Sequence, residues 1–313
     1  MLTFIIKRVA SGISVLVAIA CATFLLLYSS GIQAARNILG EYATAEQIAA
    51  KQHELGLDRP LIVQLGDWAW QAVSGNLGTS WFTNHSVADT LLTRLPVTLT
   101  LVLVAIIGIT IFATLIGVAA AVKRGWIDRV VQVGAIIGEA IPSFVLAVIL
   151  VTIFAIHLGW FPATSNIQPG SVGKEWVLSL FLPAIGLVIN GMTGTAQQIR
   201  SAVIAEMEKD YVRTLRSRGI SEPVVLFKHV LRSAAPAGLT VLSLHFIGML
   251  GGVVIIEQIF ALPGMGALAL QSTIQGDTPM VMGVVMYTVI IVIIVNLLVD
   301  LANGWLNPKV RVS

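Results

Sequence analysis

The stretch VTLTLVLVAIIGITIFATLIGVAAAV, residues 97–122, contains no charged side chain. A helix of this length, at about 1.5 Å per residue, exceeds the roughly 30 Å hydrocarbon core of a bilayer. Backbone N–H and C=O groups find no partners in lipid, so such a stretch must be helical. The composition agrees, because 56% of the 313 residues are hydrophobic and only 11% are charged, against about 25% charged in soluble domains. We therefore predict an all-α polytopic membrane protein.

Six apolar stretches are long enough to cross the bilayer. They are Val9–Ser29, Val97–Val122, Val130–His157, Trp176–Gln197, Ala237–Ala261 and Met280–Ala302. The first follows Lys7 and Arg8 as a signal peptide would, but no compelling small-x-small cleavage site follows it, so we expect it to be retained. Six crossings place both termini on one side of the membrane.

The basic residues are divided unevenly between the two sides that this topology defines. All but five of the 19 Lys and Arg residues fall on the side of the termini. The five exceptions are Arg36, Lys51, Arg59, Arg94 and Lys174. Since cytoplasmic loops carry the excess of Lys and Arg, we predict that both termini are cytoplasmic.

These sides divide the chain into four parts. They are the cytoplasmic N-terminus with the first span (1–29), an extracytoplasmic loop domain (30–96), a five-span core (97–303) and a cytoplasmic tail (304–313). In the loop domain, residues 44–55 are predicted to form a helix that Gly56 ends. Thr44 is its expected N-cap, and Gln47 stands at the spacing of a capping box.

Two pairs of glycines in the core are spaced four residues apart. They are Gly134 with Gly138, and Gly248 with Gly252. Small residues at this spacing let membrane helices approach closely. We expect packing within the chain, with a seam between subunits as the alternative.

A polar segment, residues 200–236, interrupts the core between the fourth and fifth apolar stretches. Apolar residues recur at helical spacing over residues 203–215, with charged residues on the other face. Gly219 is predicted to end this helix in a left-handed conformation, and Ser221 to cap a second helix with Pro223 in its first turn. The segment is therefore expected to form a helix, a sharp turn and a second helix in the cytosol. We call it the handle.

The residues of the handle fit two roles. One apolar stripe beside many basic side chains suits a helix pair that rests on anionic lipid. The same pattern suits a helix that docks on a protein partner. Composition and spacing leave both roles open.

An ordered set of motifs favours the second role. The handle motif is Asp210, Tyr211, Val212, Arg213, Thr214, Leu215, Arg216, Ser217, Arg218 and Gly219; others include Glu54-Leu-Gly-Leu-Asp58-Arg-Pro60, Arg94-Leu-Pro96, Pro142-Ser-Phe144, Leu182-Pro183, Glu257-Gln-Ile-Phe260-Ala-Leu-Pro263-Gly264-Met-Gly266, Asp277-Thr-Pro279 and Asn307-Pro308-Lys309. Together they resemble the permease subunits of ATP-binding-cassette (ABC) importers, in the oligopeptide/dipeptide/nickel branch (DppB/OppB-like). The resemblance extends over nearly the whole chain.

This resemblance implies a type I importer permease with six transmembrane helices, an outer loop domain and a cytoplasmic coupling helix pair. It implies that the handle couples the permease to an ATPase. The coupling candidates are Asp210, Tyr211, Val212, Arg213, Thr214, Leu215, Arg216, Arg218, Gly219 and Ser221. In such a permease Gly219→Val would abolish transport without preventing membrane insertion.

The chain offers no phosphate-binding loop of its own. Its one Gly-Lys pair, Gly173-Lys174, is followed by Glu175, whereas a phosphate-binding loop has Ser or Thr at that position. Its single cysteine, Cys21, lies in the first apolar stretch, and no metal-spaced Cys/His cluster or nucleophile motif is visible. We expect no enzyme, cofactor or metal site in this chain, and expect ATP and Mg on partner subunits.

Several polar residues fall at membrane depth, where ionisable groups are costly. Glu139 could pair with basic residues or line the path. We expect Asp300 to cap a helix or to pair near the cytoplasmic end, and His245 to be structural. Asn190 could bond between helices or face the cavity. The gating and translocation candidates are Glu139, Pro142, Glu257, Phe260, Pro263, Gly264 and Gly266, and for Glu257 gating or structural support is favoured over substrate contact.

The predicted function is substrate translocation by alternating access, driven by a separate ATPase. The resemblance implies four partners: a second homologous permease, one or two cytosolic ABC subunits, an extracytoplasmic substrate-binding protein and membrane lipid. Basic residues follow membrane sidedness, so nucleic acid is not expected. Peptide is the expected cargo, with nickel chelate, glutathione, haem or sugar as alternatives. An ion-coupled secondary carrier or a membrane scaffold is the alternative from another class, and the location is a bacterial or archaeal plasma membrane.

Overall fold

The computed structural model describes residues 2–28, 31–167 and 173–306. Within these ranges the fold is helical, and the only β pairing is an isolated bridge between Thr79 and Ser86. The helices are α1 (Leu2–Tyr28), α2 (Gly31–Leu39), α3 (Ala45–Glu54), α4 (Leu61–Val73), α5 (Val87–Lys123), α6 (Trp126–Ala140), α7 (Ser143–Leu150), α8 (Lys174–Met207), α9 (Asp210–Ser217), α10 (Glu222–Val224), α11 (Leu231–Ile259), α12 (Met265–Gln275) and α13 (Thr278–Leu306), with π-helical turns η1 (Val151–His157) and η2 (Val225–Val230). The all-α prediction is confirmed.

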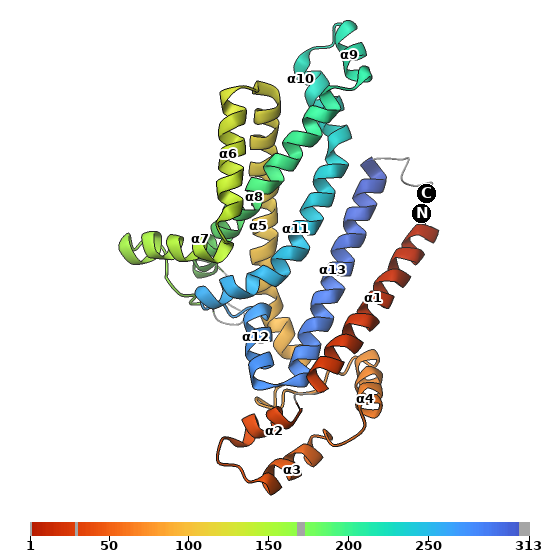
Figure 1. The fold of residues 1–313 in the computed structure, drawn as a ribbon, viewed down its shortest axis with the longest axis vertical. Coiled ribbons are helices and arrows are strands. Elements are labelled where there is room, and N and C mark those ends of the chain that lie inside the picture. Colours follow the sequence, from red (N-terminus) through yellow and green to blue (C-terminus); the bar gives the residue numbers. More distant parts are fainter. Residues whose placement is uncertain (1, 29–30, 168–172, 307–313) are drawn as a thin grey trace.

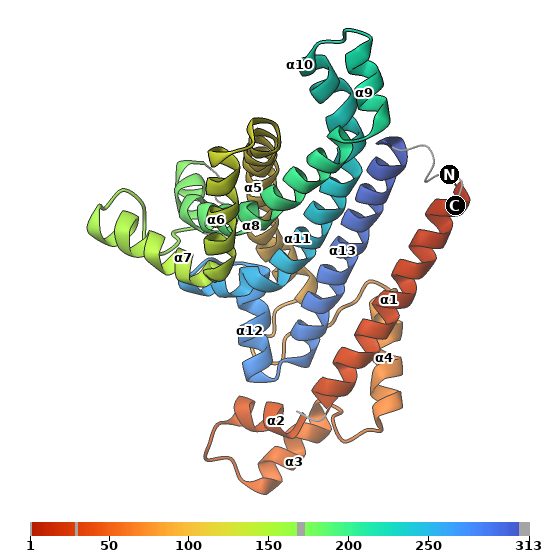
Figure 2. The ribbon, with the colours of Figure 1, turned by 45° about the horizontal axis from the view of Figure 1, so that its top comes forward.

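The long helices run side by side, with small helices at both ends (Figure 1). Both views place α2, α3 and α4 at one end and α9 and α10 at the other (Figure 2). We call these the loop end and the handle end. The start of α1 and the end of α13 lie toward the handle end, as an even number of crossings requires. Ser29 and most of the predicted tail, residues 304–313, lie outside the described residues.

Five helices in the described chain are long and apolar enough to cross a membrane, and one bent pair brings the number to six. The bent pair occupies the third predicted apolar stretch, Val130–His157. Helices α6 and α7 meet at 92°. Pro142 causes the break, because it lacks an N–H and pushes the preceding residue, Ile141, out of helical geometry. Ile141 has φ −93° and ψ 115°, and Asn190 Nδ2 donates to its carbonyl at 3.0 Å.

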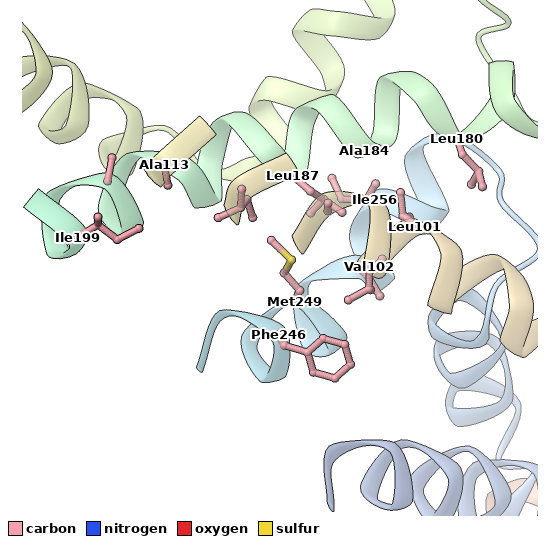
Figure 3. Packing of buried hydrophobic residues seen from close by; sticks show 14 of the residues in the cluster. Leu101, Val102, Ala113, Leu180, Ala184, Leu187, Ile199, Phe246, Met249 and Ile256 are labelled. Atoms are coloured by element: carbon pink, nitrogen blue, oxygen red, sulfur yellow. The ribbon is translucent and has the colours of Figure 1, made fainter. Parts of the chain in front are cut away.

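Helices α5, α8 and α11 form the core. Leu101, Leu187 and Met249 are buried there, one from each helix (Figure 3). Glycine permits the close approach of α5 to α8, since a Cβ at Gly117 would lie 2.6 Å from the carbonyl oxygen of Ala196. Membrane helices gain little from apolar burial alone, so this close packing holds the pair together.

Helix α1 lies at the edge of the bundle against α13. A Cβ at Gly12 would come within 2.8 Å of Ile293, so this contact is also tight. Near the handle end, Arg8 forms a two-pronged ion pair with Asp300 at 2.7 and 3.0 Å. The prediction that Asp300 pairs near that end is confirmed.

The loop domain contains the predicted helix and two more. Thr44 caps α3, and its side chain and that of Gln47 complete the capping box. Gly56 follows with φ +68°. Helices α2 and α4 were not predicted. The domain is tied to the core through Asp277, which accepts a hydrogen bond from Ser80 Oγ at 2.5 Å.

The two glycine pairs behave differently. Gly138 packs within the chain, because its Cβ would lie 2.3 Å from Thr193. Gly134, Gly248 and Gly252 have no atom of the described chain within 4 Å of a Cβ position. Packing within the chain therefore explains only one of these four glycines.

Candidate functional site

The handle contains a break that the sequence did not predict. Helix α8 ends at Met207, Lys209 is extended (φ −70°, ψ 149°), and α9 begins at Asp210. One buried carboxylate, Glu206, gathers the side chains around this break. It accepts hydrogen bonds from Lys209 Nζ at 2.5 Å and Tyr211 Oη at 2.9 Å. The expected single helix over residues 203–215 is therefore two helices, pinned at their joint.

The turn after α9 has the predicted geometry. Gly219 has φ +77°, in the left-handed region. Its N–H donates to the Arg216 carbonyl at 2.9 Å, and the Ile220 N–H donates to the Leu215 carbonyl at 3.3 Å. These two bonds form a Schellman motif, which satisfies carbonyls at the helix end.

The second helix of the handle starts where it was predicted, but not with the expected cap. Ser221 is at the N-cap, yet its side chain makes no capping bond. Instead, Glu222 and Arg216 form a two-pronged pair across the turn, at 2.7 and 3.0 Å. Pro223 lies in the first turn of α10, and the chain continues through η2 into α11. The handle is thus continuous with a crossing helix.

Helix α9 has one side toward the bundle and one side away. Val212 is fully buried, and Leu215 packs against the core. The exposed residues are Asp210, Tyr211, Arg213, Thr214, Arg216, Ser217, Arg218 and Gly219. Helix α9 lies at the end of the molecule (Figure 2), and these exposed side chains include three arginines.

Tyr211 shows how the joint affects ionisation. Its pKa is raised, first by partial burial and then by the hydrogen bond that it donates to Glu206. Both effects favour the neutral phenol, which is the form that donates this bond. Tyr211 therefore remains protonated and keeps donating this hydrogen bond to Glu206 at physiological pH.

A second cluster, at the loop end of the core, surrounds Glu257. This carboxylate is fully buried. It accepts hydrogen bonds from Thr98 Oγ1 at 2.6 Å and from the Ala267 N–H at 2.8 Å. Thr98 in turn accepts from the Met265 N–H at 2.8 Å. The carboxylate thus lies at the N-terminus of α12, where negative charge is favourable, and it joins α5, α11 and α12.

The other residues of this motif build the same cluster. A Cβ at Gly264 would lie 2.1 Å from Glu257 Oε1, and one at Gly266 would lie 2.8 Å from the Cα of Val254. Phe260 is buried, and its carbonyl accepts from the Ser165 N–H at 2.8 Å. Pro263 follows in the turn before α12. These candidates lie together, with Glu257 buried among them.

Glu139 and Pro142 lie at the bend of the third crossing. Pro142 is the N-cap residue of α7. Glu139 is exposed at the far end of α6 and has no hydrogen bond or ion pair within the described chain, although it interacts electrostatically with His245. The alternative that Glu139 pairs with a basic residue is not seen among these residues.

One ion pair was not predicted from the sequence. Arg200, on α8, makes a two-pronged contact with Asp128, on α6, with 2.6 Å between Nη2 and Oδ2. Both side chains are mostly buried, at 18% and 15% exposed. Asp128 stood in a short basic loop of the sequence, where nothing indicated its partner.

These features define a polytopic helical membrane protein whose bundle carries a bent helix pair at one end. Comparison with known sequences identifies the family of the chain. A family model described as the inner membrane component of binding-protein-dependent transport systems matches residues 113–312, and a model of the N-terminal part of such components matches residues 1–102. The chain therefore belongs to the family of binding-protein-dependent transport system inner membrane components, the permeases of ABC importers.

Individual relatives cover the whole chain. A putative peptide transport system permease of Brucella abortus (strain 2308) is 39% identical over 313 residues, with 99% of each chain covered. The glutathione transport system permease GsiC of Salmonella typhi is 34% identical over 312 residues, again with 99% of each covered. These matches favour the oligopeptide/dipeptide branch over an ion-coupled carrier.

A solved structure has the same fold. The MetNI methionine ABC transporter, in an inward-facing conformation, contains a chain with a TM-score of 0.55 at 18% identity. The match covers 70% of this chain and 96% of that one. It confirms the type I importer permease fold.

Proposed function

We propose that this chain translocates peptides by alternating access, and that α9 is the site at which a cytosolic ATPase docks. The Schellman turn at Gly219 supports this most directly, because it fixes the angle between α9 and the helix that enters α11. Force applied to the exposed face of α9 would reach both α8 and α11. These helices belong to the packed core, so the bundle would move with the handle.

Peptide is the cargo that the relatives favour. Proteins named as peptide permeases, and glutathione permeases whose cargo is itself a short peptide, match the chain from end to end. We propose a complex with a second homologous permease, one or two ABC subunits that bind ATP and Mg, and an extracytoplasmic substrate-binding protein.

The orientation follows from the charges. Within the described chain, the Lys- and Arg-rich segments lie at the handle end with the start of α1 and the end of α13, so this end is proposed to face the cytosol of a bacterium or archaeon. The loop end would then face outward. There the Glu257 cluster is proposed to brace α12 beside the outer mouth of the path.

Site-directed cross-linking tests the docking. In a Cys21→Ser background, Thr214→Cys places a thiol on the exposed face of α9, and Ser74→Cys places one at the loop end as the matched control. In membranes that contain the whole complex, the handle thiol should cross-link to the ATPase and the control should not. Repeated failure of the handle thiol, or capture by the control, would overturn the proposal.

A further inference from the structure

Uncharged polar side chains gather at the bend of the third crossing. Ser143, at the start of α7, faces the same cavity as Asn190 and Gln198 of α8 and His245 of α11. The cavity has a volume of about 270 Å³. Asn190 uses one N–H to hold the Ile141 carbonyl, so its amide oxygen is left for another partner.

Part of the cavity wall is bare backbone. Gly248 and Gly252, on α11, line the cavity, and a Cβ at either would meet no atom of the described chain within 4 Å. The rest of the lining is apolar. The polar side chains of the wall are neutral hydrogen-bonding groups, and none of its lining residues is acidic or basic apart from the imidazole.

The cavity lies near the middle of two helices that are long and apolar enough to cross a membrane. His245 is at the midpoint of α11, and Asn190 is near the middle of α8. Glu139 is exposed beside them, without an ion-pair partner in the described chain. A carboxylate and an imidazole are too costly to face hydrocarbon here. This face of the molecule must therefore meet water or polar groups.

We propose that this cavity is a wall of the solute path and contacts the backbone of the transported peptide. The inference rests on the proposed function and specifies its site. Amide, hydroxyl and imidazole groups both donate and accept hydrogen bonds, as peptide groups do. A wall with a fixed charge would hold cargo of opposite charge and repel cargo of the same charge. A neutral wall serves peptides whose side chains differ in charge.

Thiol accessibility tests the site with small changes. In the Cys21→Ser background, Gly248→Cys and Gly252→Cys place thiols toward the cavity, and Gly251→Cys is the control on the same helix, equally open but outside the lining. The assembled complex in liposomes is treated with a charged methanethiosulfonate reagent, which reacts with thiols in water. Both cavity thiols should react, and a transported tripeptide should slow the reaction severalfold. The control should show no such protection.

Two results would overturn the proposal. Unreactive cavity thiols in every nucleotide state would mean that the face is a seam with the second permease or faces lipid. Reaction that the tripeptide does not slow would mean that the cavity is wet but not on the path. Uptake of the tripeptide by the Cys21→Ser complex tests the proposed function independently of either result. It therefore distinguishes a failure of the proposed function from a failure of the proposed site.

A charge introduced into the wall gives a second readout. Gln198→Glu should raise uptake of a Lys-containing tripeptide severalfold relative to a Glu-containing one, while Gln198→Asn should leave the ratio unchanged. An unchanged ratio for the folded Gln198→Glu complex would contradict contact between this wall and the cargo.

Discussion

Thr98 and Glu257 lie 159 positions apart in the sequence and share a hydrogen bond of 2.6 Å in the buried core. Thr98 also accepts from the N–H of Met265, so a single hydroxyl links α5 to the carboxylate on α11 and to the start of α12. Every group in this chain of bonds has a partner. Buried polar networks of this kind stabilise strongly when complete and are costly when broken.

The first prediction concerns this network. Glu257→Leu should lower the free energy of unfolding by about 2–5 kcal/mol, because it leaves the hydroxyl of Thr98 and the N–H of Ala267 without an acceptor. Glu257→Gln keeps one oxygen and should cost less. The unfolding temperature in detergent measures both, with the exposed Glu41→Gln as control. Equal stability of Glu257→Leu and the parent would show that the network does not brace α12.

The second prediction concerns the turn of the handle. Gly219→Val should cost about 1–2 kcal/mol locally, since φ +77° is unfavourable for a β-branched residue. No atom lies within 4 Å of the Cβ position, so the cost arises from backbone conformation and not from a clash. Peptide uptake by the reconstituted complex should collapse while the protein still inserts. Gly219→Asn, which tolerates this conformation, should retain uptake, and normal uptake by Gly219→Val would refute the prediction.

The third prediction compares two ion pairs near the handle end. The side chains of Arg200 and Asp128 are 18% and 15% exposed, whereas those of Arg8 and Asp300 are 52% and 22% exposed. Asp128→Asn should therefore lower the unfolding temperature more than Asp300→Asn does. Unfolding temperatures at low and high salt give the comparison. Only the Arg8–Asp300 contribution should fall markedly at high salt, and the reverse order would contradict the burial argument.

The fourth prediction concerns pH at the loop end. The pKa of His53 is raised, chiefly by its hydrogen bond to Asp58, and the pKa of Asp58 is lowered by the same bond. The contribution of His53 is full below its unfolded pKa and is lost as pH rises through the higher folded value. That of Asp58 is present above its unfolded pKa and is lost as pH falls through the lower folded value.

Histidine NMR signals across a pH titration provide the measurement. The midpoint for His53 should lie above the ordinary value of about 6.5. Asp58→Asn should bring it back toward that value. A midpoint that Asp58→Asn leaves in place would show that another group causes the shift.

The sequence predicted the elements whose cause is local. Thr44 and Gln47 cap α3, and Gly219 bends the handle, because short-range spacing and backbone conformation decide both. The apolar runs likewise predicted the crossings, since lipid permits only helices there.

Features that depend on distant partners could not be predicted. The break at Lys209 depends on the burial of Glu206, which the packing of α8 determines. The sequence left open whether Asn190 bonds between helices or faces a cavity, and it does both. Gln198 was missed as a cavity residue because one apolar helix carries no local sign of which face meets a space.

The contact at Gly117 limits how the bundle can change shape. A Cβ added at Gly117 would lie 2.6 Å from the backbone oxygen of Ala196, so the backbone of α8 fills the space that a side chain of α5 would occupy. Sliding of α8 along α5 would break this close contact. We therefore expect α5 and α8 to tilt together. A displacement of these two helices at the handle end should then be accompanied by a displacement at their loop end.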